Sequence, residues 1–341
     1  MARRGRMRSI PLATFAAATA AAAQLGLGYG LGIIAWVPPD GPGPTAGGAW
    51  TASLAWASWI AATSVVIGAV VGERSTAKVP SGRFARIATR VAVALGATLG
   101  GLVVIPLIGV PASRAQIVDN YAPHLLAGIF AAIGIVAGLV VALVAVAARA
   151  VAANVIVSAV WLWTLAIIAL VDGPAGDSAG FGQLAVWKFT DTGPMWRSYY
   201  VPGVLLMLGA ALLIGGLAAF PAAGRGERRL GVAISGAAGP LLVAVAYILA
   251  SPQAGTAPDE QVSAYATAPF MIVAGLAGSL LVAAVGGPPR RRKAEAAADD
   301  DDVLTALSRA DDPAPYPAQP TYATVTGKAS VPASSRIEVG I

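Results

Sequence analysis

Cysteine is absent from this 341-residue chain. Its absence excludes disulfide bonds, thiolate metal sites and cysteine nucleophiles. Histidine occurs once, at His124, so a metal site or catalytic pair built on two histidines at helical spacing is also excluded. No glycine-rich phosphate loop followed by Lys and Ser or Thr is present. The sequence therefore favours a non-enzymatic protein and predicts no cofactor, while a membrane enzyme with an outward-facing site around His124 is left as a third alternative.

Charged residues are scarce as well. They make up 12% of the chain, against 57% hydrophobic residues, whereas soluble domains carry about 25% charged residues. Between His124 and Asp172 the only charged side chain is Arg149. Residues 125–148 and 150–171 are each long enough to cross a hydrocarbon layer of about 30 Å at about 1.5 Å per residue. Two transmembrane helices are therefore predicted to meet at Arg149.

The same pattern extends over most of the chain and predicts an all-α fold, a polytopic transmembrane helical bundle of about eight spans. The transmembrane domain covers residues 1–287, and residues 288–341 are predicted to form a disordered cytoplasmic tail, because they have too few apolar residues for a core. The first span follows a basic start, but it is longer than the core of a signal peptide; we expect an uncleaved helix and leave a cleaved signal as the alternative. The predicted spans are 10–37, 50–72, 91–110, 125–148, 150–171, 201–220, 230–250 and 265–285.

Lys and Arg residues give the orientation of the spans, because cytoplasmic loops carry an excess of them. Of the 23 such residues, only Arg114, Lys188 and Arg197 fall on the predicted outer side. Both termini are therefore expected in the cytoplasm, and the plasma membrane is the expected location.

Basic residues also suggest partners. The net charge is +6, and the basic residues flank apolar spans, so membrane lipids are the expected partners and nucleic acid is not. A basic cluster directly after the last span is predicted to contact lipid headgroups, with orientation alone as the simpler interpretation. A membrane or cytoplasmic protein partner is left open. The headgroup cluster consists of Arg290, Arg291, Arg292 and Lys293.

Glycines four residues apart recur within the spans. Such pairs share one helix face and let a neighbouring backbone approach closely. We interpret them as contacts within the bundle, with an oligomer interface as the alternative. The pairs are Gly68 with Gly72, Gly96 with Gly100, Gly134 with Gly138, Gly26 with Gly30, and Gly28 with Gly32.

Ionisable residues are missing from the middle of every predicted span. This counts against a proton relay, since such relays need intramembrane charge. A candidate intramembrane polar site is Asn154, and Gln24, Thr98 and carbonyl groups freed by prolines such as Pro106 and Pro240 are further options for a channel or carrier.

The loop over residues 172–199 is the longest between predicted spans, and loops of that length usually pack or bind something. Residues 183–189 are predicted to lie as an amphipathic segment in the membrane interface; the alternative is that the aromatic residues of the loop cap the bundle. A candidate outer-face site, for a metal or for acid–base chemistry, consists of His124, Asp119, Trp187, Lys188 and Asp191.

Spans one to four and spans five to eight are both predicted to start and end on the cytoplasmic side, so the halves are candidate parallel repeats, as in some transporters.

The sequence supports two functional hypotheses. The first is a non-enzymatic accessory or scaffold protein, which leads slightly because midplane charge is absent. The alternative is a permease or flippase-like carrier for a neutral or lipidic substrate.

Overall fold

The structure is a computed structural model, and it falls into two units, Met1–Arg292 and Lys293–Ile341. Only parts of the first unit are described below. The predicted tail, including the basic cluster Arg290, Arg291, Arg292 and Lys293, lies outside the described residues. Those residues are 2–36, 46–75, 82–115, 122–172, 183–186, 195–196, 199–251 and 259–285.

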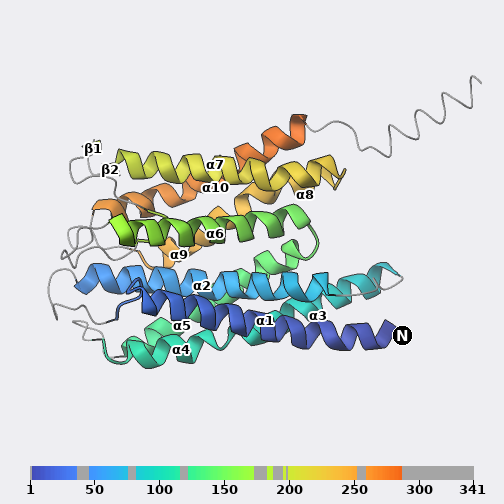
Figure 1. Cartoon of the computed structure of the whole chain (residues 1–341), viewed down its shortest axis with the longest axis horizontal. Coiled ribbons are helices and arrows are strands. Elements are labelled where there is room, and N and C mark those ends of the chain that lie inside the picture. Colours follow the sequence, from blue (N-terminus) through green and yellow to red (C-terminus); the bar gives the residue numbers. More distant parts are fainter. Residues whose placement is uncertain are drawn as a thin grey trace, which may run out of the picture. The chain divides into compact units, whose positions relative to one another are not determined.

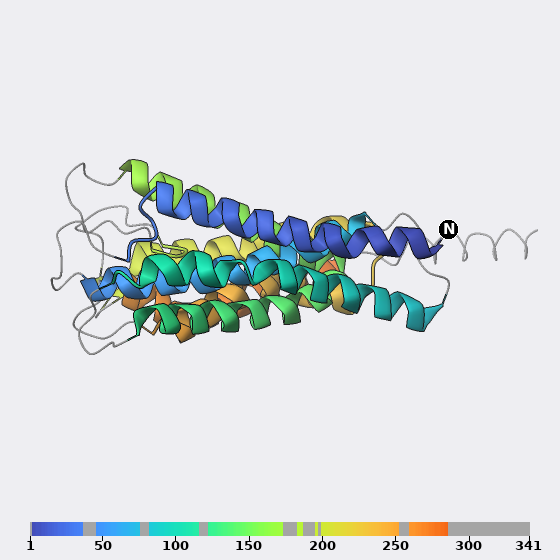
Figure 2. The same cartoon turned by 90° about the horizontal axis from the view of Figure 1, so that it is seen from below.

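Helices make up nearly all of the described chain, and they run along one common direction (Figures 1 and 2). Eight of the resulting spans are long and apolar enough to cross a membrane, which confirms the predicted fold class of an all-α transmembrane bundle. A short antiparallel hairpin pairs Met195 with Tyr200 and Trp196 with Tyr199. The elements are α1 (Ala2–Gly30), α2 (Ala46–Arg74), α3 (Arg83–Gly101), α4 (Val104–Ala112), α5 (Pro123–Ala145), α6 (Arg149–Asp172), β1 (Met195–Trp196), β2 (Tyr199–Tyr200), α7 (Val201–Gly224), α8 (Arg229–Ile234), η1 (Ser235–Ala237), α9 (Ala238–Leu249) and α10 (Asp259–Val285).

Several helices begin earlier than the predicted spans, as in α3 and α10. Residues 83–90 were predicted as part of a basic loop, and that is wrong: α3 already begins at Arg83. Arg83 and Arg86 are exposed on this first part of the helix, and Arg90 Nε donates to Glu73 Oε1 of α2 at 3.0 Å. A helix satisfies its backbone internally wherever it ends, so it can extend beyond the apolar run. In the same way, α10 begins at Asp259 rather than at residue 265.

The central helix of the bundle is α2. In its most apolar stretch 89% of the residues are buried, whereas no other span exceeds 61%. Helices α1, α3, α5, α6 and α9 all pack against it, so both halves of the chain surround this helix. Tryptophans of α2 fill the space between the halves: Trp56 and Trp59 are 5.5 Å apart between ring centroids, and Trp163 of α6 lies 5.1 Å from Trp56.

Gln24 of α1 links this tryptophan cluster to two neighbouring helices. Its Nε2 donates to Ser64 Oγ of α2 at 3.0 Å, and its Oε1 accepts from Trp163 Nε1 of α6 at 3.1 Å. Thr63 Oγ1 also donates to Gln24 Oε1. The side-chain amide of Gln24 therefore links α1, α2 and α6 by hydrogen bonds.

Three of the predicted glycine pairs are confirmed as contacts within the bundle. Side chains added to them would collide with neighbouring backbone: the position of a Cβ at Gly134 lies 2.2 Å from the Ser58 carbonyl oxygen of α2, and that at Gly100 lies 2.0 Å from the Thr14 carbonyl oxygen of α1. The three confirmed pairs bring α2 against α1, α3 against α1 and α5 against α2; they are Gly68 with Gly72, Gly96 with Gly100, and Gly134 with Gly138.

The glycine pairs of the first span are different. For Gly26 with Gly30 the prediction is wrong, because both residues are exposed and no atom lies within 4 Å of an added Cβ. In the other pair, Gly28 is buried and an added Cβ would meet Ile34 and Trp163 of α6, whereas Gly32 follows the helix with φ of 70° and serves the turn there. The spacing alone could not distinguish these pairs from the others, because all of them lie in apolar stretches.

The two halves of the chain share one packing pattern. Among the described residues, the second and fourth spans of each half pack closely, the third packs against both, and the first and fourth make no extended contact. In Figure 1, α1 to α5 form one group and α6 to α10 the other. Residues 135–139 and 272–276 both read Ile-Val-Ala-Gly-Leu and place Gly138 and Gly275 at close helix contacts. These features support the prediction that the two halves are parallel repeats of one another.

The halves do not join symmetrically, however. Helix α2 of the first half contacts α6 and α9 of the second, whereas α7, its counterpart, lies outside and makes no matching extended contact with α1 or α4 among the described residues. The first half therefore supplies the centre of the bundle.

We predict that Gly134→Ala destabilises the bundle by about 1–3 kcal/mol, because the new methyl group must push apart two backbones. The measurement is thermal unfolding of the purified protein in detergent, followed by tryptophan fluorescence. Gly26→Ala is the matched control and should leave the midpoint unchanged, since space is open there. Equal losses in both variants would contradict the packing described.

Candidate functional site

The seventh span is broken in its middle. Helix α8 ends at Ile234, the 3-10 turn η1 covers Ser235–Ala237, and α9 continues from Ala238. Pro240, in the first turn of α9, explains the break. It has no N–H, and its ring would clash with the carbonyl of Gly236 in a continuous α-helix. The third span is interrupted in a similar way between α3 and α4, shortly before Pro106.

Side chains of two other helices satisfy the backbone groups that this break releases. The Gly236 N–H donates to Ser279 Oγ of α10 at 3.2 Å, and the same hydroxyl donates to the Ala233 carbonyl at 2.6 Å. The Gly239 N–H donates to Asn154 Oδ1 of α6 at 2.7 Å. Such pairing is required in a hydrocarbon layer, where no water is present to replace it.

A cavity lies directly beside the break. Its walls come from α6, α7, α9, α10 and residues 183–186, and include Ser158, Met207, Gly239, Pro240 and Met271. These helical residues lie near the middle of their spans, so the cavity is at mid-depth. It gives the centre of a water molecule about 20 Å³ of space, somewhat more than one ordered water needs.

Two polar groups at this place have unused hydrogen-bonding capacity. Asn154 is fully buried, and its Nδ2 has no hydrogen-bond partner among the described residues. Ser158, one turn further along α6, lines the cavity and is 8% exposed. Within the described part of the chain its hydroxyl also has no partner. Unpaired buried donors are costly, which makes them candidate contacts for a ligand.

Gly239 makes room for these groups. A Cβ at that position would lie 2.1 Å from Ser158 Oγ and 3.1 Å from Asn154 Oδ1. The sequence prediction of Asn154 as an intramembrane polar residue thus falls on a residue that holds the interrupted helix, one turn before Ser158, which lines the cavity.

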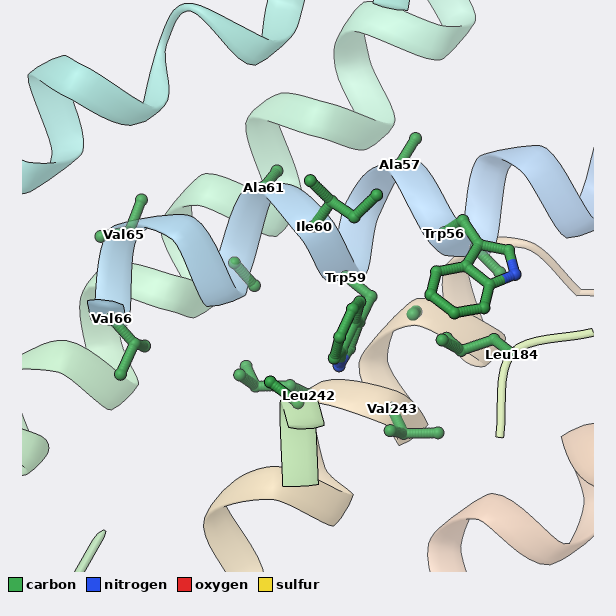
Figure 3. Close-up of a cluster of buried hydrophobic side chains, with 14 of the residues drawn as sticks. Trp56, Ala57, Trp59, Ile60, Ala61, Val65, Val66, Leu184, Leu242 and Val243 are labelled. Atoms are coloured by element: carbon green, nitrogen blue, oxygen red, sulfur yellow. The ribbon is translucent and has the colours of Figure 1, made fainter. Parts of the chain in front are cut away.

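A turn from the loop between α6 and α7 contributes to the wall of the cavity. Residues 183–186 form a turn in which Leu184, Ala185 and Val186 are buried, and Ala185 lines the cavity. The Tyr247 hydroxyl of α9 donates to the Leu184 carbonyl. Figure 3 shows Leu184 beside Trp56 of α2, with Leu242 and Val243 of α9 facing Trp59.

Ala185 adopts φ of 65°, a left-handed conformation that disfavours residues with a Cβ. This local strain is held in place by the surrounding contacts. The prediction of an amphipathic interfacial segment is wrong for residues 183–186, because this part is buried in the bundle. The remaining residues of that segment, including Trp187 and Lys188, lie outside the described residues.

The predicted outer-face site is described only at one residue. His124 is exposed near the start of α5, and Asp119, Trp187, Lys188 and Asp191 lie outside the described residues. Within the described ranges no group of three or more His, Asp or Glu residues is close enough to hold a metal ion. The outer-face site therefore stays a prediction.

The other intramembrane candidates have structural roles. Gln24 joins three helices, and Thr98 Oγ1 donates to the Ala94 carbonyl of its own helix at 2.9 Å.

The sequence analysis did not predict Ser158, Gly239 and Ser279 as residues of this site. The sequence feature that indicates the helix break is the run Ser-Gly-Ala-Ala-Gly-Pro at residues 235–240, which combines small residues and a proline inside an apolar span.

The sequence after α6 contains one further motif. Residues 176–180 read Gly-Asp-Ser-Ala-Gly, a literal match to the Gly-x-Ser-x-Gly nucleophile elbow. The elbow needs a strand before it and a helix after it, and the element that precedes this match is helix α6. Residues 176–180 themselves lie outside the described residues, so the match carries no catalytic assignment.

Comparisons of the chain with protein-family models, with curated proteins and with solved structures find no match. The geometry around the broken seventh span is therefore what supports a function.

We predict that Asn154→Ala lowers the free energy of unfolding by about 1–3 kcal/mol, because the buried Gly239 N–H loses its acceptor. Ser158→Ala is the matched control on the same helix and should cost much less, since no protein partner is lost. Thermal unfolding in detergent measures both. Similar losses in the two variants would contradict the different roles given to these residues.

Proposed function

We propose that this integral membrane protein is a carrier for a neutral, lipidic molecule, and that the cavity beside the broken seventh span is its binding site. The observation that carries the proposal is the meeting of three features within the spans: a helix break whose Gly239 N–H is held by Asn154, a cavity beside it, and the Ser158 hydroxyl in the wall of that cavity. In secondary transporters, substrates bind near the bilayer midplane where spans are interrupted.

The polarity of the interior supports a neutral substrate. The buried polar residues in the described part of the chain are Ser, Thr, Asn and Gln, and none of them is ionisable at neutral pH. Most of the cavity wall is apolar, as with Trp161, Leu162 and Met207. A charged substrate would meet no counter-charge there, and an unpaired charge in such an environment is strongly unfavourable.

The repeated break of the third span in each half gives further support. Interruptions of apolar spans at corresponding positions of two halves are typical of transporter binding sites. Here the break after Gly101 and the break at η1 occupy the same place in the order of spans. The cavity described above lies beside the second break, so the second half is where binding is expected.

The orientation and location belong to the same proposal. Arg74, Arg83, Arg149, Arg225 and Arg229 lie at the end of the bundle where α2 and α7 terminate. The positive-inside rule favours the cytoplasm for that end, with both termini on the same side, and the plasma membrane as the membrane concerned. Residues 183–186 would then close the cavity from the outer side.

An accessory or scaffold role is the second candidate. It is favoured by the close packing of the first half, where glycines of α2, α3 and α5 bring helix backbones into contact. A rigid half of this kind is suited to hold a membrane or cytoplasmic partner. Under this alternative the cavity would be a packing defect without a ligand.

We expect the purified full chain, reconstituted in vesicles, to make a fluorescent glycosyl diacylglycerol, an uncharged lipid, of the inner leaflet accessible to a quencher added outside. Ala211→Phe should reduce this exchange to the level of protein-free vesicles, because Ala211 is buried and lines the cavity. Leu213→Phe is the matched control, since Leu213 is 62% exposed on the same helix and a larger side chain there meets only lipid.

Absence of exchange with the unaltered chain would contradict a carrier for an uncharged lipid. Native mass spectrometry after gentle extraction then tests the second candidate. A stoichiometric protein partner, retained equally by Ala211→Phe, would favour the accessory role.

A further inference from the structure

We propose that the arginines where α6, α7 and α8 meet, Arg149, Arg228 and Arg229, bind the phosphate headgroup of an anionic phospholipid, whose acyl chains lie along the exposed apolar side chains of α7 and α8. The site lies at the ends of these helices, whereas the cavity beside the broken seventh span lies within the bundle. The inference therefore goes beyond the proposed function and does not depend on it.

The fold brings these arginines to one place from two distant parts of the chain. Arg149 is the first residue of α6, whereas Arg228 directly precedes α8 and Arg229 begins it. The two helix starts are in contact, since a Cβ added at Gly231 would lie 3.5 Å from the Ala148 Cβ. Figure 1 shows both starts, and the end of α7, at the same end of the bundle.

The turn between α7 and α8 is held in place by its own hydrogen bonds and by the packing below it. Gly226 adopts φ of 68°, and the Glu227 N–H donates to the Ala222 carbonyl of α7 at 3.1 Å. Ala222 is in turn buried together with Ala150 of α6 and Val232 of α8. The backbone that carries Arg228 and Arg229 is therefore anchored to both neighbouring helices.

The three arginines form no ion pair within the described part of the chain, and their side chains are exposed. The described carboxylates at this end of the bundle bond other arginines. Glu227 Oε1 accepts from Arg225 Nη2 at 2.9 Å, and Glu73 Oε1 accepts from Arg90 Nε at 3.0 Å. The positive charge of Arg149, Arg228 and Arg229 is thus left for an anionic ligand. Guanidinium groups bind phosphate oxygens through parallel pairs of hydrogen bonds.

Exposed apolar side chains close to these arginines indicate that the anion is part of a lipid. Leu230 directly follows Arg229 and is 73% exposed, and Phe220, one turn before the end of α7, is 70% exposed. In a transmembrane bundle such side chains contact lipid tails, which are equally apolar. Basic residues between spans recognise anionic lipid headgroups in this setting. A phospholipid with a net negative headgroup matches both features, whereas a free phosphate ion would match only the charge.

The test uses the full chain in phosphatidylcholine vesicles that contain a trace of phosphatidylglycerol with a photoactivatable diazirine in its acyl chain. After irradiation, peptide mass spectrometry should find the label on Phe220 and Leu230. Replacing part of the phosphatidylcholine by unlabelled phosphatidylglycerol should remove this label, whereas phosphatidylethanolamine, whose headgroup has no net charge, should not. Inorganic phosphate on both sides of the membrane, at constant ionic strength, should leave the label unchanged.

Variants test the role of single arginines. Arg149→Gln, Arg228→Gln and Arg229→Gln should each raise the share of unlabelled phosphatidylglycerol that halves the label by roughly three- to tenfold, the range expected for one basic residue near an anionic headgroup. Arg74→Gln is the matched control, because Arg74 is exposed at the same end of the bundle in the first half, and it should leave this share unchanged. Thermal unfolding of all four variants should match the unaltered chain, so a loss of folding is recognised directly.

An equal effect of Arg74→Gln and Arg229→Gln would overturn the inference, because it would show attraction by the total charge of this end rather than binding at one site. Equal competition by phosphatidylethanolamine would overturn it by showing that the headgroup charge is not recognised. Loss of the label with inorganic phosphate would also overturn it, since the site would then take a soluble anion. These outcomes are independent of lipid exchange by the carrier.

Discussion

This structure depends on one constraint, the need to hydrogen-bond every backbone group in a medium without water. Each N–H and C=O group inside a hydrocarbon layer needs a partner within the protein, and unbroken helices provide it automatically. Where Pro240 prevents a continuous helix, Ser279 and Asn154 take over that task from α10 and α6. The broken seventh span is therefore stable only in contact with these two helices, which brings polar groups to mid-depth and places the cavity among them.

Close packing by small residues is the complementary feature. Lipid tails are as apolar as the helix surfaces, so burial of apolar area gives little drive for association, and tight van der Waals contact has to supply it. Glycines of α2, α3, α5, α7 and α10 allow backbones to touch. The same contacts leave little free space between the helices, so the cavity next to Gly239 is an exception to the close packing. Pro240 and the strained Ala185 line this cavity, so it results from specific local structure.

Part of the site could be predicted from the sequence. Asn154 stood out because a polar amide within a long apolar run has to find a partner. Ser158 did not, since single serines in helices usually donate to their own backbone, as Ser58 does to the Leu54 carbonyl. The turn at residues 183–186 was assigned to the interface from its aromatic neighbours. Its burial depends on contacts with Trp56 and Tyr247, which are more than sixty residues away along the chain and have no local signature.

The sequence by itself determined the all-α class and the presence of eight apolar spans, because length and hydrophobicity decide locally whether a helix can lie in a membrane. The printed chain also carries the charge asymmetry that predicts orientation. Only the tertiary structure decided that α2 is the centre, that Gly26 and Gly30 stay open while Gly134 and Gly138 are packed, and that Asn154 and Ser158 both lie against Gly239. These properties depend on which helix faces lie against each other, and an apolar helix that is uniform around its circumference does not specify its neighbours.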